Sequence, residues 1–289
     1  MRLVPLSSAL VLSATVLGSC TSSDEDSAGG VDANVASSID ASNLPVTDAR
    51  PPLPDAIPGP DAMPVPLACA GQALPSTVLN PPITISGSVQ SVATIAGPMP
   101  LGVSASIKAF QIADDSLIVA VNSVAATGSN TFSLVDPVGG PTPLAAYVKA
   151  TAAGHVDTYL YAPYDIYENF TNALFLMFGV DLWGLVPLVA GVTVDDGNGA
   201  IMIIVADCDQ EAVEDATVSI QPAVGEIRYG DADGLPSSDL TSTQGQGIAF
   251  IFNVPPGNYT VDAERGGVSF REHGVAAFAD AATTTIIVP

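Results

Sequence analysis

Short runs of alternating apolar and polar residues, separated by glycine and proline, dominate the chain from about residue 67 to its end. In the first such run, Ile83, Ile85 and Val89 occupy odd positions and small polar residues stand between them. An alternation of period two places apolar side chains on one face of a β-strand. Ile201–Ala206 is instead apolar throughout, as in a strand that is buried on both faces. The chain contains 26 Gly and 24 Pro, and so many turn-forming residues favour short strands over long helices.

Further strands are expected in two groups. The first group lies at 103–109, 117–121, 131–135, 144–151 and 157–161, and the second at 213–220, 248–254, 259–263, 275–278 and 283–288. Strands at intervals of about 8–12 residues are typical of β-sandwiches. The groups also resemble each other, because Tyr147 and Gly154 have the same spacing as Tyr259 and Gly266. The sequence therefore predicts two small sandwiches, at 67–163 and 199–289.

The stretch between the two groups, 164–198, breaks the alternation. Ile166, Phe170, Leu174 and Phe178 recur at four-residue spacing, and an almost uncharged run, Leu182–Val189, follows them. Such spacing is typical of an amphipathic helix. We therefore expect a short helical, apolar connector between the sandwiches.

Three roles are open for this connector. It can pack between the sandwiches as a plug, or it can insert into a membrane, although Asp181 and Pro187 count against a membrane span. It can also expose an apolar patch that docks a partner. The residues of such a docking patch would be Phe175, Phe178, Leu182 and Trp183.

The first twenty residues have the layout of an export signal. Arg2 gives a positive start, an apolar run covers Leu10–Leu17, and small residues precede Cys20. The apolar run is too short to cross a bilayer as a helix. The end of this segment resembles the lipobox of bacterial lipoproteins, which implies that residues 1–19 are removed and that Cys20 carries lipid. An ordinary secretory signal with an incidental cysteine is the alternative.

Residues 20–66 are predicted to form a disordered linker. This stretch is rich in Ser, Asp, Ala, Gly and Pro, and Arg50 is its one basic residue. It contains too little apolar surface to offset the entropy lost on ordering. Its repeated Asp-Ala pairs, some of which follow proline, are similar to the linkers of bacterial surface lipoproteins. Proline and like charges together favour a semi-extended spacer.

The cysteine count predicts one disulfide. The chain has 3 Cys, and lipid on Cys20 leaves Cys69 and Cys208. An exported protein folds in an oxidising compartment, so these two cysteines are expected to pair. Two free, buried thiols are the alternative.

One stretch of the second sandwich resembles a known family. The run Thr243–Val261 contains Phe250, Asn253-Val254-Pro255 and Tyr259, and it is similar to the carboxypeptidase regulatory-like domain. The resemblance covers 199–289 well and 82–162 weakly. It implies tandem transthyretin-like or Ig-like β-sandwiches without catalytic activity of their own. Its kinship with starch-binding-like sandwiches implies carbohydrate binding as an alternative.

Sequence motifs for catalysis are missing. The chain has no H-E-x-x-H, G-x-S-x-G or P-loop pattern, and its histidines, His155 and His273, have no His or Cys at ligand spacing. We expect no enzyme activity, cofactor or metal site, with an unrecognised hydrolase built on a Ser/His/Asp triad as a third hypothesis. Lys and Arg number 7 against 30 Asp and Glu, which gives a net charge of −23 and argues against nucleic-acid binding.

Calcium is the metal that the acidic loops would suit best. Clusters of oxygen ligands occur at 195–198, 207–211 and 231–234, and calcium prefers six to eight such oxygens. None of the clusters has the spacing of an EF-hand loop. Acidic clusters are also expected by composition alone in a chain of this charge.

Together these features predict a lipid-anchored protein of the bacterial cell envelope, placed at the outer membrane. Its partners would be the membrane, through the lipid, and an unknown envelope protein or glycan. The favoured role is structural or ligand-binding rather than catalytic, because a sandwich presents loops and strand edges on a rigid core.

Overall fold

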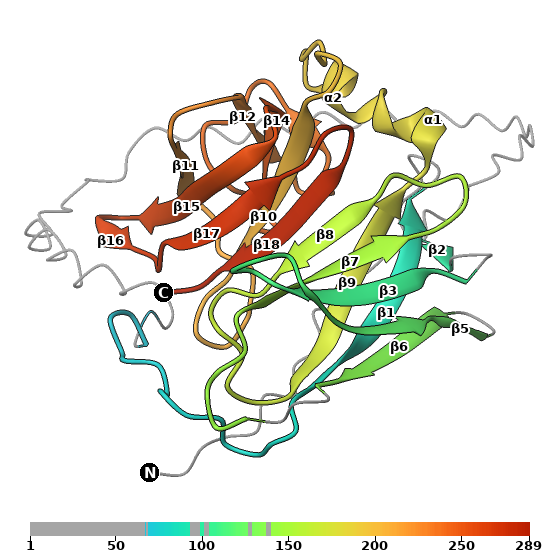
Figure 1. Cartoon of the computed structure of the whole chain (residues 1–289). Helices are drawn as coiled ribbons and strands as arrows, with labels where there is room; N and C mark the ends of the chain where they lie inside the picture. Colours follow the sequence, from blue (N-terminus) through green and yellow to red (C-terminus); the bar gives the residue numbers. More distant parts are fainter. Residues whose placement is uncertain (1–66, 68, 93–98, 101–103, 127–128, 137–139) are drawn as a thin grey trace, which may run out of the picture. The chain divides into compact units, whose positions relative to one another are not determined.

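The computed structural model describes residues 67, 69–92, 99–100, 104–126, 129–136 and 140–289 (Figure 1). The predicted signal peptide, the linker and Cys20 lie outside the described residues. The described chain is built mainly of strands that form sandwiches, with short helical turns between them, so the predicted fold class is confirmed.

Three sheets make up the fold (Figure 1). The five-stranded sheet contains β1 (Thr84–Val92), β2 (Met99–Pro100), β5 (Val124–Ala126), β6 (Ser129–Val135) and β9 (Phe170–Phe178). The four-stranded sheet contains β11 (Thr217–Gln221), β15 (Gly257–Arg265), β16 (Val268–Ser269) and β17 (His273–Ala277). The nine-stranded sheet contains β3 (Ser106–Gln111), β4 (Leu117–Asn122), β7 (Ala146–Thr151), β8 (Thr158–Tyr161), β10 (Gly199–Val205), β12 (Glu226–Gly230), β13 (Pro236–Ser237), β14 (Ile248–Val254) and β18 (Ala282–Ile287).

The nine-stranded sheet runs through both predicted sandwiches. Its order is β13-β12-β14-β10-β18-β8-β7-β3-β4. The first four of its strands and β18 come from the second group of the sequence, and the other four come from the first group. The two groups meet where β8 pairs in parallel with β18, from Thr158 opposite Ala282 to Tyr161 opposite Thr285.

The likeness between the two groups extends to their strand pairing. β1 pairs antiparallel with β6 and parallel with β9, and β10 pairs in the same two ways with β14 and β18. The antiparallel series β3-β7-β8 likewise corresponds to β11-β15-β17. Tyr147 lies in β7 and Tyr259 in the equivalent strand β15. The repeated spacing in the sequence therefore reflects a repeated supersecondary unit.

In the strands of the nine-stranded sheet where the two groups meet, successive side chains pack into different cores on the two faces of the sheet. On β7 and β8, Val148 and Leu160 pack against the five-stranded sheet, where Ile85, Phe132 and Phe175 are also buried. Tyr147, Tyr159 and Tyr161 point to the other face and join the core beneath the four-stranded sheet. The shared sheet therefore carries one sandwich on each of its faces, and its joining strands are buried from both sides.

The amphipathic helix expected over Ile166–Phe178 is wrong, because most of this segment forms β9. β9 lies beside β1, with Phe175 opposite Val89 and Phe178 opposite Val92. Ala173, Phe175 and Met177 face the first core, while Leu176 packs on its other side against Met202. When both faces of a strand are apolar, the sequence shows no alternation of apolar and polar residues. The four-residue spacing of large side chains in this segment therefore resembled that of a helix by chance.

Helical structure of the connector is limited to two short turns, α1 (Val180–Trp183) and α2 (Val186–Val189). Ala190 and Val192 follow α2 and are buried against the outer face of β10 and β14. The connector thus covers the part of the nine-stranded sheet that the five-stranded sheet leaves open.

Replacing Phe175 by alanine should destabilise the fold by about 3–5 kcal/mol, because it leaves a cavity around a ring that is fully buried beside Phe132. Urea unfolding monitored by circular dichroism would measure the change. The control Val180→Ala removes an aliphatic side chain that is 57% exposed, so it should change stability by less than about 0.5 kcal/mol. Equal effects of the two substitutions would contradict the burial of β9.

Candidate functional site

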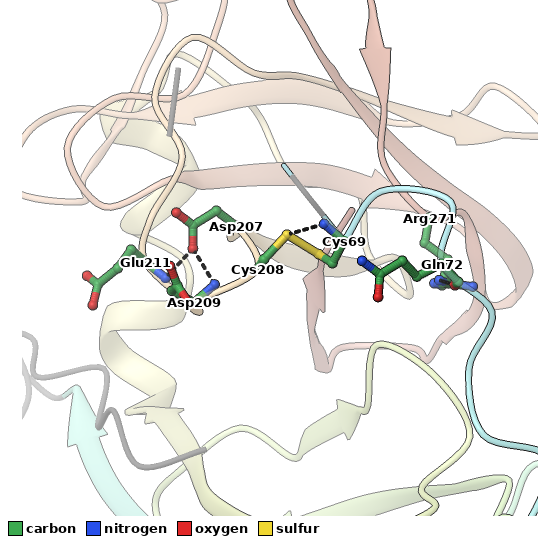
Figure 2. Close-up of a disulfide and its surroundings, with 7 residues drawn as sticks. All are labelled: Cys69, Gln72, Asp207, Cys208, Asp209, Glu211 and Arg271. Carbon is green, nitrogen blue, oxygen red and sulfur yellow. Dashed lines mark hydrogen bonds between the residues drawn. A yellow bond between two sulfur atoms is a disulfide. The ribbon is translucent and has the colours of Figure 1, made fainter. Parts of the chain in front are cut away.

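The junction between the first described residues and the rest of the folded body is a disulfide. The Sγ atoms of Cys69 and Cys208 lie 2.10 Å apart in a disulfide (Figure 2). This is the pair that the cysteine count predicts. Cys208 lies just beyond the end of β10, and β10 is an inner strand of the nine-stranded sheet. The start of the described body is therefore bonded to the loop that follows one of its inner strands.

Polar contacts brace this junction on both sides (Figure 2). The buried carboxylate of Asp207 accepts hydrogen bonds from the backbone N–H groups of Asp209 and Glu211, at 2.8 and 3.0 Å. On the other side, Arg271 Nη2 donates to the backbone oxygen of Gln72, at 2.8 Å. These contacts hold the turns on either side of the disulfide, so the junction is a fixed point of the fold.

Removal of the disulfide by Cys208→Ser, with Cys69→Ser so that no free thiol remains, should cost about 5 kcal/mol. The estimate follows from loop-closure entropy for a sequence separation of 139 residues. Guanidinium unfolding of the oxidised wild type and of the double variant would measure it. A loss of less than about 1 kcal/mol would show that the bond is absent or ineffective.

The docking patch predicted at Phe175, Phe178, Leu182 and Trp183 is not exposed. Phe175 is fully buried, and Phe178 and Leu182 are 8% and 7% exposed. Trp183 is half-buried, and its ring lies 5.5 Å from that of Phe178. Phe175 belongs to the first core, whereas Phe178, Leu182 and Trp183 pack with Ala282 and the outer face of β10. The connector therefore covers the nine-stranded sheet and does not form the plug that was expected between the sandwiches.

The opposite side of the connector does expose apolar groups. Val180, Leu185, Leu188 and Val189 are each more than half exposed. Beneath them, only water-sized gaps of about 10 Å³ remain beside Trp183. Sites for small molecules need roughly 300–1,000 Å³, so these gaps beside Trp183 are too small for a small-molecule ligand.

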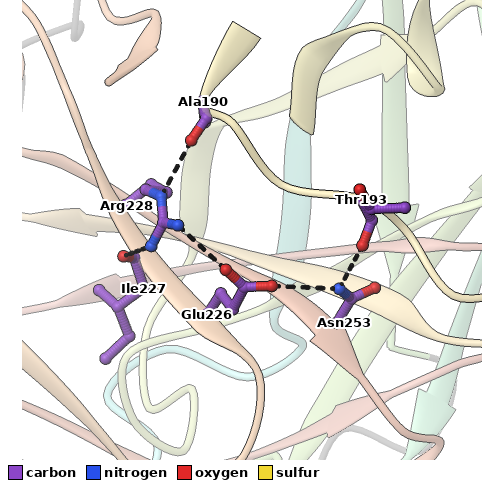
Figure 3. A network of polar contacts seen from close by, with 6 residues as sticks. All are labelled: Ala190, Thr193, Glu226, Ile227, Arg228 and Asn253. Atoms are coloured by element: carbon purple, nitrogen blue, oxygen red, sulfur yellow. Dashed lines mark hydrogen bonds and ion pairs between the residues drawn. The ribbon is translucent and has the colours of Figure 1, made fainter. Parts of the chain in front are cut away.

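A polar network ties the connector to the second sandwich (Figure 3). Arg228 Nε donates to the backbone oxygen of Ala190 at 3.0 Å, and Arg228 Nη2 forms an ion pair with Glu226 at 3.0 Å. Asn253 Nδ2 donates to the backbone oxygen of Thr193 at 2.7 Å, and its Oδ1 accepts from the N–H of Asp195 at 2.8 Å. These side chains form hydrogen bonds with connector backbone groups that have no partner in a neighbouring strand.

His155 lies beside a serine. Ser91 Oγ and His155 Nε2 are 2.7 Å apart, and His155 Nδ1 lies 2.9 Å from the backbone oxygen of Ala153. Because a carbonyl can only accept, Nδ1 carries the proton and Nε2 accepts from the serine hydroxyl. This is the orientation of a nucleophile and its base, but a carbonyl stands in the place of a carboxylate and Ser91 is buried. The contact instead fastens the β7–β8 loop to β1.

His273 lies beside a threonine at the junction of the two sandwiches. His273 Nε2 is 2.6 Å from Thr285 Oγ1, and that hydroxyl donates to the backbone oxygen of Tyr161 in β8 at 3.2 Å. Because the hydroxyl proton is used on the carbonyl, Nε2 donates to Thr285. Burial lowers the pKa of His273 to about 4.

The depressed pKa of His273 predicts a loss of stability in acid. The unfolded chain takes up the proton below about pH 6.5, whereas the folded chain resists it until pH falls through about 4. The histidine therefore contributes about 3 kcal/mol of stability above pH 6.5 that is lost as pH falls to 4. Urea unfolding at pH 7.5 and pH 4 should show that wild type loses this much more than His273→Gln. Identical losses would contradict a buried, neutral imidazole.

The acidic loops that suggested calcium use their carboxylates in turns. Asp231 Oδ1 accepts from the N–H groups of Asp233 and Leu235, both at 3.0 Å, and Asp280 accepts from Gly197 at 3.2 Å. Within the described part of the chain, His, Cys, Asp and Glu side chains form no group of three or more that could hold a metal ion. Asp231 and Asp280 therefore act as turn-forming groups.

No sequence pattern indicates the two hydroxyl–histidine pairs or the contacts of Arg228. Only Asn253 gave a signal, through its place in the Asn-Val-Pro stretch. Its φ is 57°, a conformation that Asn tolerates better than most residues, and its amide then reaches the connector. None of the helices in the described ranges is long and apolar enough to cross a membrane.

Comparisons with known proteins give no relative of established function. No family model matches the chain, and no curated protein matches its sequence. The resemblance to the carboxypeptidase regulatory-like domain therefore stays a prediction, while the β-sandwich fold that it implied is present.

Among solved structures, the chain is similar to the Bacillus anthracis TIE protein, at 16% identity over 72% of this chain, with a TM-score of 0.21. The match spans only 34% of that protein. Shaft pilin SpaA from Lactobacillus rhamnosus GG matches at 12% identity over 72% of this chain and 98% of its own, with a TM-score of 0.23. GBS52, the minor pilin of Streptococcus agalactiae, matches at 11% identity over 71% and 94%, with a TM-score of 0.24. Scores this low support no argument about function.

Proposed function

We propose that this chain is a non-enzymatic, lipid-anchored protein of the bacterial cell envelope, whose rigid double sandwich is presented on a tether. The observation that carries the proposal is the bond between Cys69 and Cys208. It ties the first described residues, which follow the predicted linker, to the loop after β10, an inner strand of the shared sheet. A body whose first described residues are bonded covalently to its core suits a protein that is held by its N-terminal end and bears its partner on its surface.

The charge and composition of the preceding residues support the tether. Residues 20–66 contain repeated Asp-Ala pairs and prolines, which favour an extended spacer. Acyl chains on Cys20 would bind a bilayer through about 0.8 kcal/mol for each buried CH₂ group. The negative charge of −23 works against adhesion to anionic lipid, so the acyl chains, and not the folded surface, would hold the protein at the membrane.

The body is better suited to bind protein surfaces than small ligands or sugars. Only gaps of about 10 Å³ open beside Trp183. Tyr147, Tyr159 and Tyr161, which could form an aromatic platform for sugar rings, are each less than 10% exposed. What remains on the surface of the described body is strand edges, loops and the aliphatic face of the connector.

Anchoring is tested by Cys20→Ser, expressed from the full gene in a bacterium that processes lipoproteins. Wild type should take up an alkyne-labelled fatty acid and sediment with membranes, whereas Cys20→Ser should lose the label and appear in the soluble fraction. Ser19→Ala is the matched control, since it keeps a small residue before the cut and should behave as wild type. Equal membrane association of wild type and Cys20→Ser would overturn the lipid anchor.

The binding role is tested on the same material. Crosslinking in intact cells followed by purification should recover a defined envelope protein with wild type, and a glycan array should give no signal at micromolar protein. A reproducible glycan signal would instead favour the carbohydrate-binding alternative that the starch-binding-like kinship implies.

A further inference from the structure

A histidine takes an inward position on an edge strand of the four-stranded sheet. This strand, β17, pairs with β15 and with no other described strand. Successive residues of a strand face opposite sides, so His273, Val275 and Ala277 share the inward face. Val275 and Ala277 are buried in the core beneath the sheet. His273 is therefore a titratable group on a face that otherwise buries small apolar side chains.

Two polar contacts tie β17 to β18, a strand of the nine-stranded sheet. His273 Nε2 donates to Thr285 Oγ1 at 2.6 Å, and that hydroxyl donates to the backbone oxygen of Tyr161 in β8 at 3.2 Å. Thr283 Oγ1 donates to the backbone oxygen of Ala276 at 2.7 Å. The imidazole therefore begins a chain of hydrogen bonds that ends on β8, in the pairing that joins the two sandwiches.

The other ring nitrogen of His273 has no acceptor for a further proton. Nδ1 is buried and has no hydrogen-bond partner among the described residues. Because Nε2 already carries the proton that it donates to Thr285, protonation adds one at Nδ1. The result is an unpaired N–H group and a positive charge inside the body. Burying such a charge costs far more than burying a neutral imidazole, so protonation favours a conformation that exposes the ring.

The carboxylates of β15 and of the residue before the histidine face away from the imidazole. Val261 of β15 stands opposite His273, and both are inward positions. Asp262 and Glu264 alternate to the outer face of the sheet. Glu272 is exposed, and its charge acts on Asp262. None of these three carboxylates is therefore placed to neutralise a charged imidazole.

The strands beneath β17 do not supply a negative partner to the imidazole either. Their inward titratable side chains are Tyr147, Tyr159 and Tyr161. Burial raises the pKa of Tyr147 and of Tyr161, so both stay neutral in acid. The carboxylate of Asp115 accepts from the Tyr147 hydroxyl at 3.1 Å. Arg271, two residues before the histidine, is positive and donates to the backbone of the preceding chain, so its charge opposes protonation of the imidazole.

We propose that the bond between His273 and Thr285 is an acid-sensitive latch: protonation of His273 releases β17 from the nine-stranded sheet while the rest of the described body stays folded. β17 has 5 residues and lies at an edge, and short edge elements open at a lower free energy than the core. Its release would uncover the edge of β15 and the tyrosines beneath it. The surface open to a partner would then depend on pH.

Hydrogen exchange of the full chain at pH 7 and pH 4, corrected for the intrinsic rate at each pH, tests the latch. The released imidazole has the ordinary pKa near 6.5 and the bound one a pKa of about 4. The open form should therefore be about a hundredfold more populated at pH 4. Amides of residues 273–277 should show this increase, whereas those of β10 and β14 should keep their protection. Trp183, the one tryptophan of the chain, should keep its native fluorescence.

His273→Gln should abolish the increase, because its amide can still donate to Thr285 but does not titrate. His155→Gln is the matched control, since it removes the other histidine of the chain and should leave the increase unchanged. A second measurement needs no variant: the NMR resonances of the His273 ring should titrate together with the opening of β17.

Four results would overturn the latch. They are unchanged protection of β17 at pH 4, joint loss of protection in β10, β14 and β17, an equal increase in His273→Gln, and a His273 ring that titrates near pH 6.5 while β17 stays protected. The second result would mean global unfolding, and the third would assign the acid response to another group.

Discussion

The parallel pairing of β8 with β18 is the contact on which the architecture depends. It turns two sandwiches of a duplicated unit into one body with a single nine-stranded sheet. The pairing is buried from both sides, and hydroxyls of β18 reinforce it, since Thr284 and Thr285 donate to the backbone oxygens of Tyr159 and Tyr161. β-Branched side chains suit such a strand, and hydroxyls bonded to carbonyls remove the penalty of burying polar atoms.

The local pattern of the sequence was sufficient for much of this fold. Alternation and turn residues predicted most strands, because each strand or turn carries its own local pattern. The equal spacing of Tyr147 and Gly154 and of Tyr259 and Gly266 predicted the repeated unit. The pairing of β8 with β18, which joins the two sandwiches through one sheet, was not predictable from such local patterns. It depends on which strand edges meet, and β8 and β18 are far apart in the sequence.

The segment of β9 shows the limit of periodicity. Its residues face the first core on one side and the outer face of β10 on the other. Both faces are therefore apolar, and only the partner strand β1 reveals its structure. Because Phe175 and Phe178 are buried as residues of β9, they do not belong to an exposed docking patch as predicted. The cysteine pair was predictable because it needs only a count and a compartment, whereas the histidine–hydroxyl pairs need tertiary positions.

The bridge between Cys69 and Cys208 also decides how a mechanical load would travel. Tension applied before Cys69 would pass through the sulfurs to Cys208 and on into the residues that follow it. The chain from 70 to 207, which includes β10, would lie in a closed covalent loop outside this direct path. Most of the first sandwich would then be spared from stretching. A pull between the leader and the C-terminal strand β18 would be borne by the hydrogen bonds between β10 and β18. Cys208 follows Val205 and the C-terminus follows Ile287, so both forces would act at the same end of this parallel pair, and its hydrogen bonds would open one after another from that end.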